Sequence, residues 1–282
     1  MTPERSMRIT GTTRCYPILG HPIAQVRTVP AINAYFAAQE IDAVMVPMEI
    51  PPGGIEALLA LMRSWSNCGG ASVTVPHKQA AFRACDRLTD RARLVGAVNI
   101  IRREPDGSLV GDMTDGLAFV EAMGRNGIAV SGRTLLVAGA AGGAGSAIAQ
   151  ALCGAGAARL CLVDPSRERL GLLAGRLAAD FPGCRIDEGW PDDARVDVAV
   201  NASPVGMRRD DPLPIDLDRL SPGAAVCDVI TKPVMTPLLV EAARRGHPIQ
   251  DGNEMADVQL PFQMRHLGLW ADEALAPEGD PT

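Results

Sequence analysis

Short apolar runs alternate along the chain with stretches whose apolar residues recur every three or four positions. Runs of the first kind predict strands, and the second spacing predicts helices with one face in the core. In the first part, strands are expected at 15–19, 43–47 and 70–75, and helices at 32–39 and 55–65. After residue 133, strands are expected at 134–138, 159–163, 196–201 and 224–230, and helices at 146–154, 167–178 and 237–245. This order predicts an α/β fold whose second half holds a buried, parallel sheet.

Residues 96–111 break this alternation. Asp106 and Gly107 form a dipeptide that favours a tight turn, and apolar residues stand on both sides of it. The segment therefore predicts a β-hairpin, which makes the sheet of the first half mixed. The helix expected at 116–125 then bridges the two halves of the chain.

Composition narrows the class of function. The chain has 282 residues, a formal net charge of −6 and an isoelectric point near 5.3, so no basic surface is expected for nucleic acid or anionic lipid. It contains no apolar run of the ~20 residues that span a bilayer. Seven scattered cysteines predict reduced thiols in a cytoplasmic protein, and the four histidines lack the spacing of metal ligands. A small molecule is the expected partner; the oligomeric state, monomer or homodimer, stays open.

A glycine-rich segment follows the strand expected at 134–138 and opens an alanine-rich helix. It runs Gly139-Ala-Ala-Gly-Gly-Ala-Gly145. Glycine permits a sharp turn and brings backbone N–H groups close to a pyrophosphate, so the segment predicts a dinucleotide site. A nucleoside triphosphate is disfavoured, because Gly145 is followed by Ser146 and not by the lysine of a Walker loop.

The preference between NAD and NADP is predicted from Asp164, which directly follows the strand expected at 159–163. At this position an acidic side chain accepts hydrogen bonds from the ribose hydroxyls of NAD and repels the 2′-phosphate of NADP. The sequence therefore predicts NAD, with NADP less favoured. Arg167, which either stacks on the adenine or lies in solvent, keeps a tolerance of NADP open.

Six segments in chain order resemble motifs of the shikimate dehydrogenase family, and the likeness covers nearly the whole length. Each fragment is weak alone, whereas six in the same order are specific. The segments are Ser72-Val-Thr74-Val-Pro-His-Lys78, Gly96-Ala-Val-Asn99-Ile, Gly111-Asp-Met-Thr-Asp115-Gly, Asn201-Ala-Ser203-Pro-Val-Gly-Met207, Asp228-Val229 with Thr236-Pro-Leu-Leu, and Gly252 followed by Met255 and Gln259.

The resemblance implies an oxidoreductase that moves hydride between a nicotinamide and a ring carbon of a cyclic hydroxy acid such as shikimate or quinate. Lys78 is implied as the group that exchanges a proton with the reacting oxygen, and Asp115 as its partner. Substrate contacts are implied for Thr74, Asn99 and Gln259. The residues implied at the cofactor are Gly139, Ala140, Gly142, Gly143, Ala144, Asp164, Arg167, Ser203, Met207, Val229, Gly252 and Met255.

The segment implied to bind the substrate carboxylate departs from the family pattern of two serines. Val26 takes the place of the first serine and removes a hydroxyl donor, whereas Thr28 keeps a hydroxyl at the second. Arg27 between them either replaces the lost contact or points into solvent. Ser72 in place of an asparagine and Thr231 in place of a tyrosine change the same pocket. These departures leave the identity of the substrate open, but they do not change the chemistry that the resemblance implies.

The resemblance also implies two domains with a cleft between them. A mixed-sheet substrate domain is expected at 1–119 and a Rossmann-type domain at 120–249, with a helix in 250–282 that packs back on the first. Two alternatives to the first function stay open. One is an NAD-linked dehydrogenase of a different small carboxylate. The other is a non-catalytic sensor of NAD or a ring acid. A sensor needs no proton donor, so it is disfavoured by the joint retention of Lys78, Asp115, Asn99 and Gln259.

Overall fold

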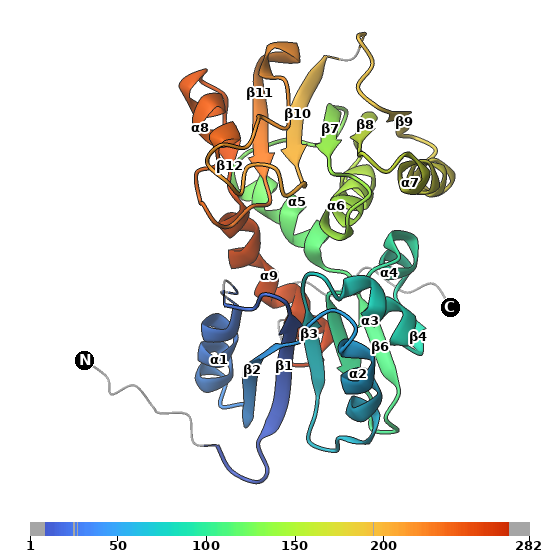
Figure 1. Cartoon of the computed structure of the whole chain (residues 1–282), viewed down its shortest axis with the longest axis vertical. Coiled ribbons are helices and arrows are strands. Elements are labelled where there is room, and N and C mark those ends of the chain that lie inside the picture. The colour runs from blue at the N-terminus through green and yellow to red at the C-terminus, as the bar shows by residue number, and fades with distance from the viewer. Residues whose placement is uncertain (1–8, 25, 27, 194, 271–282) are drawn as a thin grey trace, which may run out of the picture.

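The structure is a computed structural model that describes residues 9–24, 26, 28–193 and 195–270 and builds them into two six-stranded sheets (Figure 1). The first sheet has the order β2-β1-β3-β5-β6-β4. In it β1 pairs in parallel with β2 and β3, whereas β5 runs antiparallel to β3 and β6, so the predicted mixed sheet and hairpin are confirmed. Its strands are β1 (Arg14–Gly20), β2 (Ala43–Glu49), β3 (Gly70–Val73), β4 (Arg87–Leu88), β5 (Ile100–Arg103) and β6 (Leu109–Asp112).

The second sheet has the order β12-β11-β10-β7-β8-β9, and its pairings are parallel. Counted from β7, this is the 3-2-1-4-5-6 order of a doubly wound dinucleotide-binding sheet. The predicted α/β class and parallel second sheet are therefore confirmed. The strands are β7 (Thr134–Ala138), β8 (Arg159–Val163), β9 (Arg185–Glu188), β10 (Val196–Asn201), β11 (Leu220–Asp228) and β12 (Ile249–Gln250).

Helices cover both faces of the second sheet, because successive apolar residues of a strand point to opposite faces. In β7, Leu135 and Val137 pack in one core with α6 and α7, whereas Leu136 packs in another core with α8. The helices are α1 (Thr28–Ala38), α2 (Ile55–Ser64), α3 (Lys78–Ala84), α4 (Asp90–Val95), α5 (Asp115–Arg125), α6 (Gly143–Gly154), α7 (Arg167–Asp180), α8 (Pro237–Arg244) and α9 (Gly252–His266).

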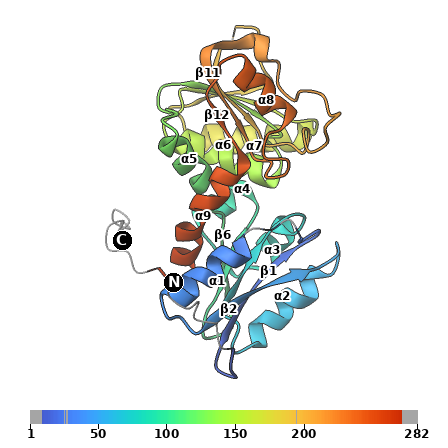
Figure 2. The same cartoon turned by 90° about the vertical axis from the view of Figure 1, so that its left-hand side faces the viewer.

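Two helices connect the halves of the molecule (Figure 2). α5 leads the chain from the first sheet to the second, and α9 leads it back. They pack on each other through Ala118 and Ala122 of α5 and Val258 of α9. At its far end α9 places Met264 in the apolar cluster of Tyr16. The last described helix therefore completes the core of the first sheet.

The predicted strands and helices are present, several with shifted ends, and the strands β4, β9 and β12 were not predicted. α6 begins at Gly143 and not at residue 146, because the loop glycines continue into its first turn, and β11 begins at Leu220 and not at residue 224. The short helices α3 and α4 were not predicted, since seven and six residues are too few to display a helical period.

The expected division into 1–119, 120–249 and 250–282 stays a prediction; it would cut α5, and residues 271–282 lie outside the described part of the chain. Within that part, none of the helices has both the length and the apolar character needed to span a bilayer. A cytoplasmic location stays a prediction.

Candidate active site

Lys78 and Asp115 form an ion pair between the first sheet and the bridging helix α5. Lys78 begins α3, shortly after the end of β3, and Asp115 is the first residue of α5. The lysine side chain is 14% exposed and the carboxylate 3%, and the Lys78 ammonium donates to Oδ2 of Asp115. The helix dipole favours a carboxylate at this end of α5. Two residues that are 37 positions apart in sequence thus meet at one point.

Two carboxamides hold the other oxygen of Asp115. Asn99, which precedes β5, and Gln259 of α9 both donate to Oδ1, Gln259 over 2.7 Å. Asn99 is fixed in turn, because its Oδ1 accepts from the backbone N–H of Thr114 over 2.9 Å. The position of the carboxylate therefore depends on α3, the start of β5, and both connecting helices.

This arrangement is suited to moving a proton at a substrate hydroxyl. An ammonium can give a proton to a developing alkoxide and take it back in the reverse direction. The buried carboxylate of Asp115 orients the Lys78 ammonium, since both of its oxygens are held by hydrogen bonds. The carboxamides of Asn99 and Gln259 add neutral hydrogen-bonding groups beside the pair.

The glycine loop lies next to the lysine. Gly139 has a φ of +76°, and a Cβ on Gly145 would lie 2.1 Å from the carbonyl oxygen of Gly139, so both positions require glycine. Gly142 is the N-cap of α6 and provides no side-chain hydrogen bond to the first turn, which leaves those N–H groups available to an anion. A Cβ on Gly143 would lie 3.7 Å from Cδ of Lys78. A phosphate site and a proton-transfer group are thereby neighbours.

Asp164 is engaged by the backbone of the glycine loop. Its Oδ2 accepts from the N–H of Ala141 over 3.0 Å, and its Oδ1 accepts from the N–H of Ser166 over 2.9 Å. The carboxylate therefore fixes the loop to the end of β8. Arg167 is exposed at the start of α7.

A cavity of about 210 Å³ lies between the glycine loop, α7 and the first half of the molecule. Arg169 and Arg176 of α7 line it, together with Ala141–Gly143 and Gln79. The two arginines are seven residues apart and so lie on the same face of α7. Arg176 also donates to the carbonyl oxygen of Leu94 at the end of α4 over 3.1 Å. The cavity therefore offers positive charge beside the predicted phosphate site.

A buried polar cluster fixes the loops that follow β10 and β11. Asp228 is fully buried and accepts hydrogen bonds from Asn201 and from the hydroxyl of Thr236, the latter over 2.9 Å. Burial raises the pKa of Asp228 above its usual range, although these hydrogen bonds oppose the shift. A Cβ on Gly252 would lie 2.5 Å from the carbonyl oxygen of Val229, so α9 starts in contact with the loop after β11.

The remaining residues predicted at the cofactor fall around these loops. The hydroxyl of Ser203 donates to Oδ1 of Asn201 over 2.7 Å, which folds the loop after β10. Met207 lies in that loop and is 57% exposed, and Met255 packs between the core of the second sheet and α5. Ala140 is buried and Ala144 half-buried in the glycine loop.

The residues predicted at the substrate lie mainly around α9 and the start of α1. The hydroxyl of Ser72, 2% exposed, donates to Oε1 of Gln263 over 3.3 Å. Val26 packs against the apolar cluster of Met264, and the buried Oγ1 of Thr28 has no hydrogen-bond partner among the described residues. Thr74 directly follows β3, Thr231 lies in the loop after β11, and both are half-buried; Arg27 lies outside the described residues.

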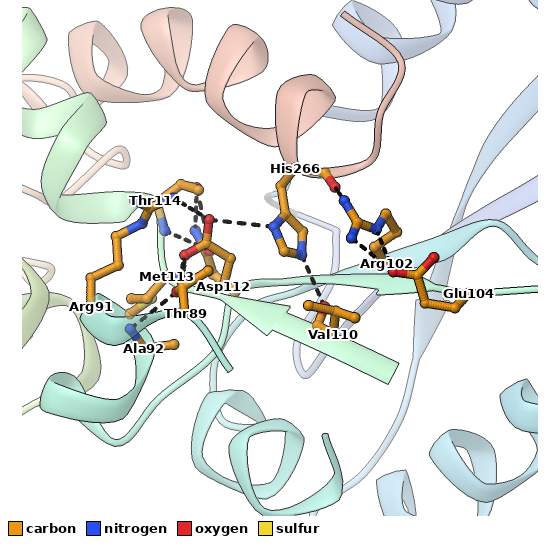
Figure 3. A network of polar contacts seen from close by, with 11 residues as sticks. Thr89, Arg91, Ala92, Arg102, Glu104, Val110, Asp112, Met113, Thr114 and His266 are labelled. Carbon is orange, nitrogen blue, oxygen red and sulfur yellow. Dashed lines mark hydrogen bonds and ion pairs between the residues drawn. The ribbon is translucent and has the colours of Figure 1, made fainter. Parts of the chain in front are cut away.

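A second buried carboxylate, Asp112, connects α4 and α9 just ahead of Asp115 (Figure 3). It pairs with Arg91 of α4, accepts from the hydroxyl of Thr89 and lies 3.5 Å from Nδ1 of His266. Burial is the largest influence on the pKa of Asp112 and acts to raise it, but Arg91, His266 and the Thr89 hydroxyl together outweigh burial, and the pKa lies below its usual range. Oδ1 also accepts from the N–H of Met113 over 2.7 Å, which holds the turn that leads to the ion pair.

Sequence reasoning missed three residues that the structure places at the site. Arg169 and Arg176 could have been predicted from the sequence, because arginines seven residues apart on a helix lie on the same face. Gln263 is one helical turn beyond Gln259, which is also a readable spacing. Its pairing with Ser72 is not readable, since 191 residues separate them.

Comparison with known proteins gives consistent results. A family model described as the shikimate dehydrogenase substrate binding domain matches residues 18–101. A shikimate dehydrogenase (NADP(+)) from Rubrobacter xylanophilus is 41% identical, over 84% of each chain. Among solved structures, shikimate 5-dehydrogenase from Thermus thermophilus with NADP(H) and shikimate has a TM-score of 0.78 at 28% identity, over 92% of this chain and 95% of that one. The enzyme of that name from Listeria monocytogenes, with shikimate and NAD, has a TM-score of 0.80 at 26% identity, over 93% of both.

The predicted preference for NAD is wrong. The Rubrobacter relative and three further curated relatives are all named as NADP(+) enzymes. The structure gives a physical reason: the oxygens of Asp164 accept from two backbone N–H groups, which partly offset the negative charge that was expected to repel a 2′-phosphate. The positive charge of Arg169 and Arg176 in the adjoining cavity favours an anion there.

Proposed function

Because the chain belongs to the shikimate dehydrogenase family, we propose that it transfers hydride between NADP(H) and a ring carbon of a cyclic hydroxy acid. The substrate class is that of shikimate and quinate, with the 3-dehydro ketone as the oxidised form. One observation carries the proposal. The Lys78–Asp115 pair, with Asn99 and Gln259 on its carboxylate, lies beside the glycine loop at the N-terminus of α6.

In the proposed reaction, the nicotinamide supplies or accepts the hydride when it is bound. During oxidation Lys78, as the neutral amine, takes the proton of the substrate hydroxyl and becomes the ammonium; during reduction the ammonium returns the proton to the oxygen. Asp115 holds the Lys78 side chain in place and accepts a hydrogen bond from a neighbouring ring hydroxyl. Asn99 and Gln259 orient Asp115 and contact the ring. Domain 1–119 with α9 would hold the substrate, and 120–249 the cofactor.

For the cofactor, we propose that the first turn of α6 binds the pyrophosphate and that Arg169 binds the 2′-phosphate of NADP. The N-cap of α6 leaves backbone N–H groups free for an anion. Arg169 lines the cavity that the loop residues Ala141–Gly143 also line. A guanidinium matches a phosphate in charge and geometry. Ser203, Met207, Val229 and Gly252 would then form the wall of the nicotinamide pocket.

The test incubates the protein with a panel of ring acids and either NADP⁺ or NAD⁺ and measures the absorbance of the NADPH or NADH that forms. We expect turnover of shikimate, quinate or a related ring hydroxy acid with NADP⁺, and a kcat/KM for NADP⁺ at least tenfold above that for NAD⁺. Turnover of the ring acid with NAD⁺ alone would refute the cofactor assignment. Binding of both ligands by calorimetry without turnover of any ring acid would favour a sensor over an enzyme.

A further inference from the structure

Only one of the two polar atoms of the Gln263 carboxamide, Oε1, has a hydrogen-bond partner among the described residues. The side chain is 4% exposed, and its Oε1 accepts from the buried hydroxyl of Ser72 over 3.3 Å. Its Nε2 donates no hydrogen bond to any of the described residues. Nε2 is also not among the polar atoms that are both unpaired and fully buried. A nearly buried NH2 group that no acceptor among the described residues satisfies is costly unless a ligand or water accepts from it.

Gln263 points into the same region as the ion pair. It lies four residues after Gln259, so the two carboxamides are neighbours on one face of α9. Gln259 donates to Asp115, and Gln263 accepts from Ser72 of β3, the strand that leads to Lys78. The face of α9 that carries both glutamines therefore borders the site on the side of β3.

A second unused donor lies near this face. Oγ1 of Thr28, at the start of α1, is buried without a partner in the described part of the molecule. Val26 belongs to the apolar cluster of Leu260 and Met264, which places the segment before α1 against the middle of α9. The Thr28 hydroxyl and the Gln263 amide thus border the region between α1, β3 and α9.

On the basis of the proposed function, we propose that Gln263 binds the carboxylate of the ring acid through its Nε2–H and so determines the substrate class. An NH2 group can only donate, and an ionised carboxylate can only accept, so the two are complementary. A neutral ring hydroxyl is a weaker acceptor for the same N–H. Gln263 then provides the donor that Val26 does not. Ser72 positions the amide, because its hydroxyl occupies Oε1 and leaves the NH2 turned to the ligand.

The experiment compares shikimate with shikimate carboxamide in wild type, Gln263→Leu and Gln263→Glu. We expect wild type to bind shikimate more tightly than the carboxamide by calorimetry. Gln263→Leu removes one hydrogen bond to a charged group, so the Kd and KM for shikimate rise about ten- to a hundred-fold with kcat little changed. Gln263→Glu keeps the acceptor for Ser72 but repels the carboxylate, so it should bind the carboxamide better than shikimate.

The matched control is Asp257→Asn on the exposed face of the same helix, which should bind both ligands as wild type does. NADPH affinity and melting temperature are measured for each variant. Equal shikimate affinity in wild type and Gln263→Glu would overturn the inference, as would no binding by wild type. If Gln263→Leu fails to fold, the nearly isosteric glutamate variant decides. If Gln263→Glu weakens shikimate binding but the wild-type protein turns over no ring acid, the proposed function is refuted, whereas the role of Gln263 in binding the carboxylate stands.

Discussion

At the scale of single residues, the site is built around the carboxylate of Asp115. It accepts from one charged and two neutral donors that come from α3, the start of β5 and α9. A carboxylate with this many donors is held in one orientation, and it holds Lys78 in turn. The lysine is thus positioned for its proposed task before any ligand binds.

Replacing Lys78 with alanine tests that task. If the ammonium transfers the proton, Lys78→Ala should lower kcat about 10²- to 10⁴-fold, the range that general acid–base catalysis contributes. NADPH affinity should stay close to that of wild type, because the pyrophosphate site uses backbone N–H groups. Single-turnover kinetics and calorimetry measure the two quantities. Arg125→Ala, an exposed change at the end of α5, serves as the control; a kcat that stays within threefold of wild type would contradict the role of Lys78.

Arg169 tests the proposed phosphate contact. Arg169→Ser removes a charge-assisted hydrogen bond, so the Kd for NADPH should rise about ten- to a hundred-fold. The Kd for NADH should change little, since that ligand lacks the 2′-phosphate. Both values follow from fluorescence titration of the reduced cofactor. Equal losses for the two cofactors would assign Arg169 to a group that they share.

At the scale of elements, the glycine loop depends on close backbone contact. Gly145→Ala places a Cβ 2.1 Å from the Gly139 carbonyl oxygen, so the loop must move and NADPH binding should fall below detection. Gly175→Ala is the matched control: it lies in α7, and a Cβ there meets nothing within 4 Å. That control should bind NADPH normally and stabilise the fold by about 0.5–1 kcal/mol, as Ala does relative to Gly in a helix. Normal binding by Gly145→Ala would refute the loop as the phosphate site.

The sequence predicted those elements whose local pattern matches their environment. The strands β7, β8 and β10 and the second half of β11 are mostly apolar, and the Asp106-Gly107 dipeptide favours a turn, so these strands and the hairpin could be predicted. The edge strand β9 is mostly charged and was not predicted. The pair of Lys78 and Asp115 was found through a family resemblance and not from spacing. The cofactor preference was misread from Asp164, because the sequence does not reveal that backbone N–H groups of the glycine loop and of Ser166 partly offset its charge.

At the scale of the whole molecule, His266 ties the end of α9 to the first sheet. Its Nε2–H donates to the carbonyl oxygen of Val110 over 2.9 Å, and Asp112, Arg91 and Arg102 surround the ring (Figure 3). Burial lowers the pKa of His266, and Asp112 only partly opposes this effect. The folded protein therefore takes up this proton less readily than the unfolded chain does.

The sign of the pH dependence follows from that difference. As the pH falls through about 6.5, the ordinary pKa of histidine, the unfolded chain gains the proton first and the free energy of unfolding decreases. Between pH 7 and 5.5 this group should account for a loss of at most about 1 kcal/mol. His266→Gln keeps an N–H donor but does not titrate, so urea unfolding should show a smaller loss for the variant. Parallel curves for the two proteins would refute the assignment.

The return of α9 to the first sheet has a consequence for how the protein is made. β1 starts at residue 14, and the helix that completes its core starts at residue 252. At roughly 5–20 residues per second, the ribosome needs on the order of 10–50 s between these two points. By the end of that interval the second sheet has all of its own strands, whereas the part of the apolar cluster around Tyr16 that Met264 covers is still exposed. The half that is synthesised first is thus the half that matures last, and nascent chains at this stage are the ones that chaperones would protect.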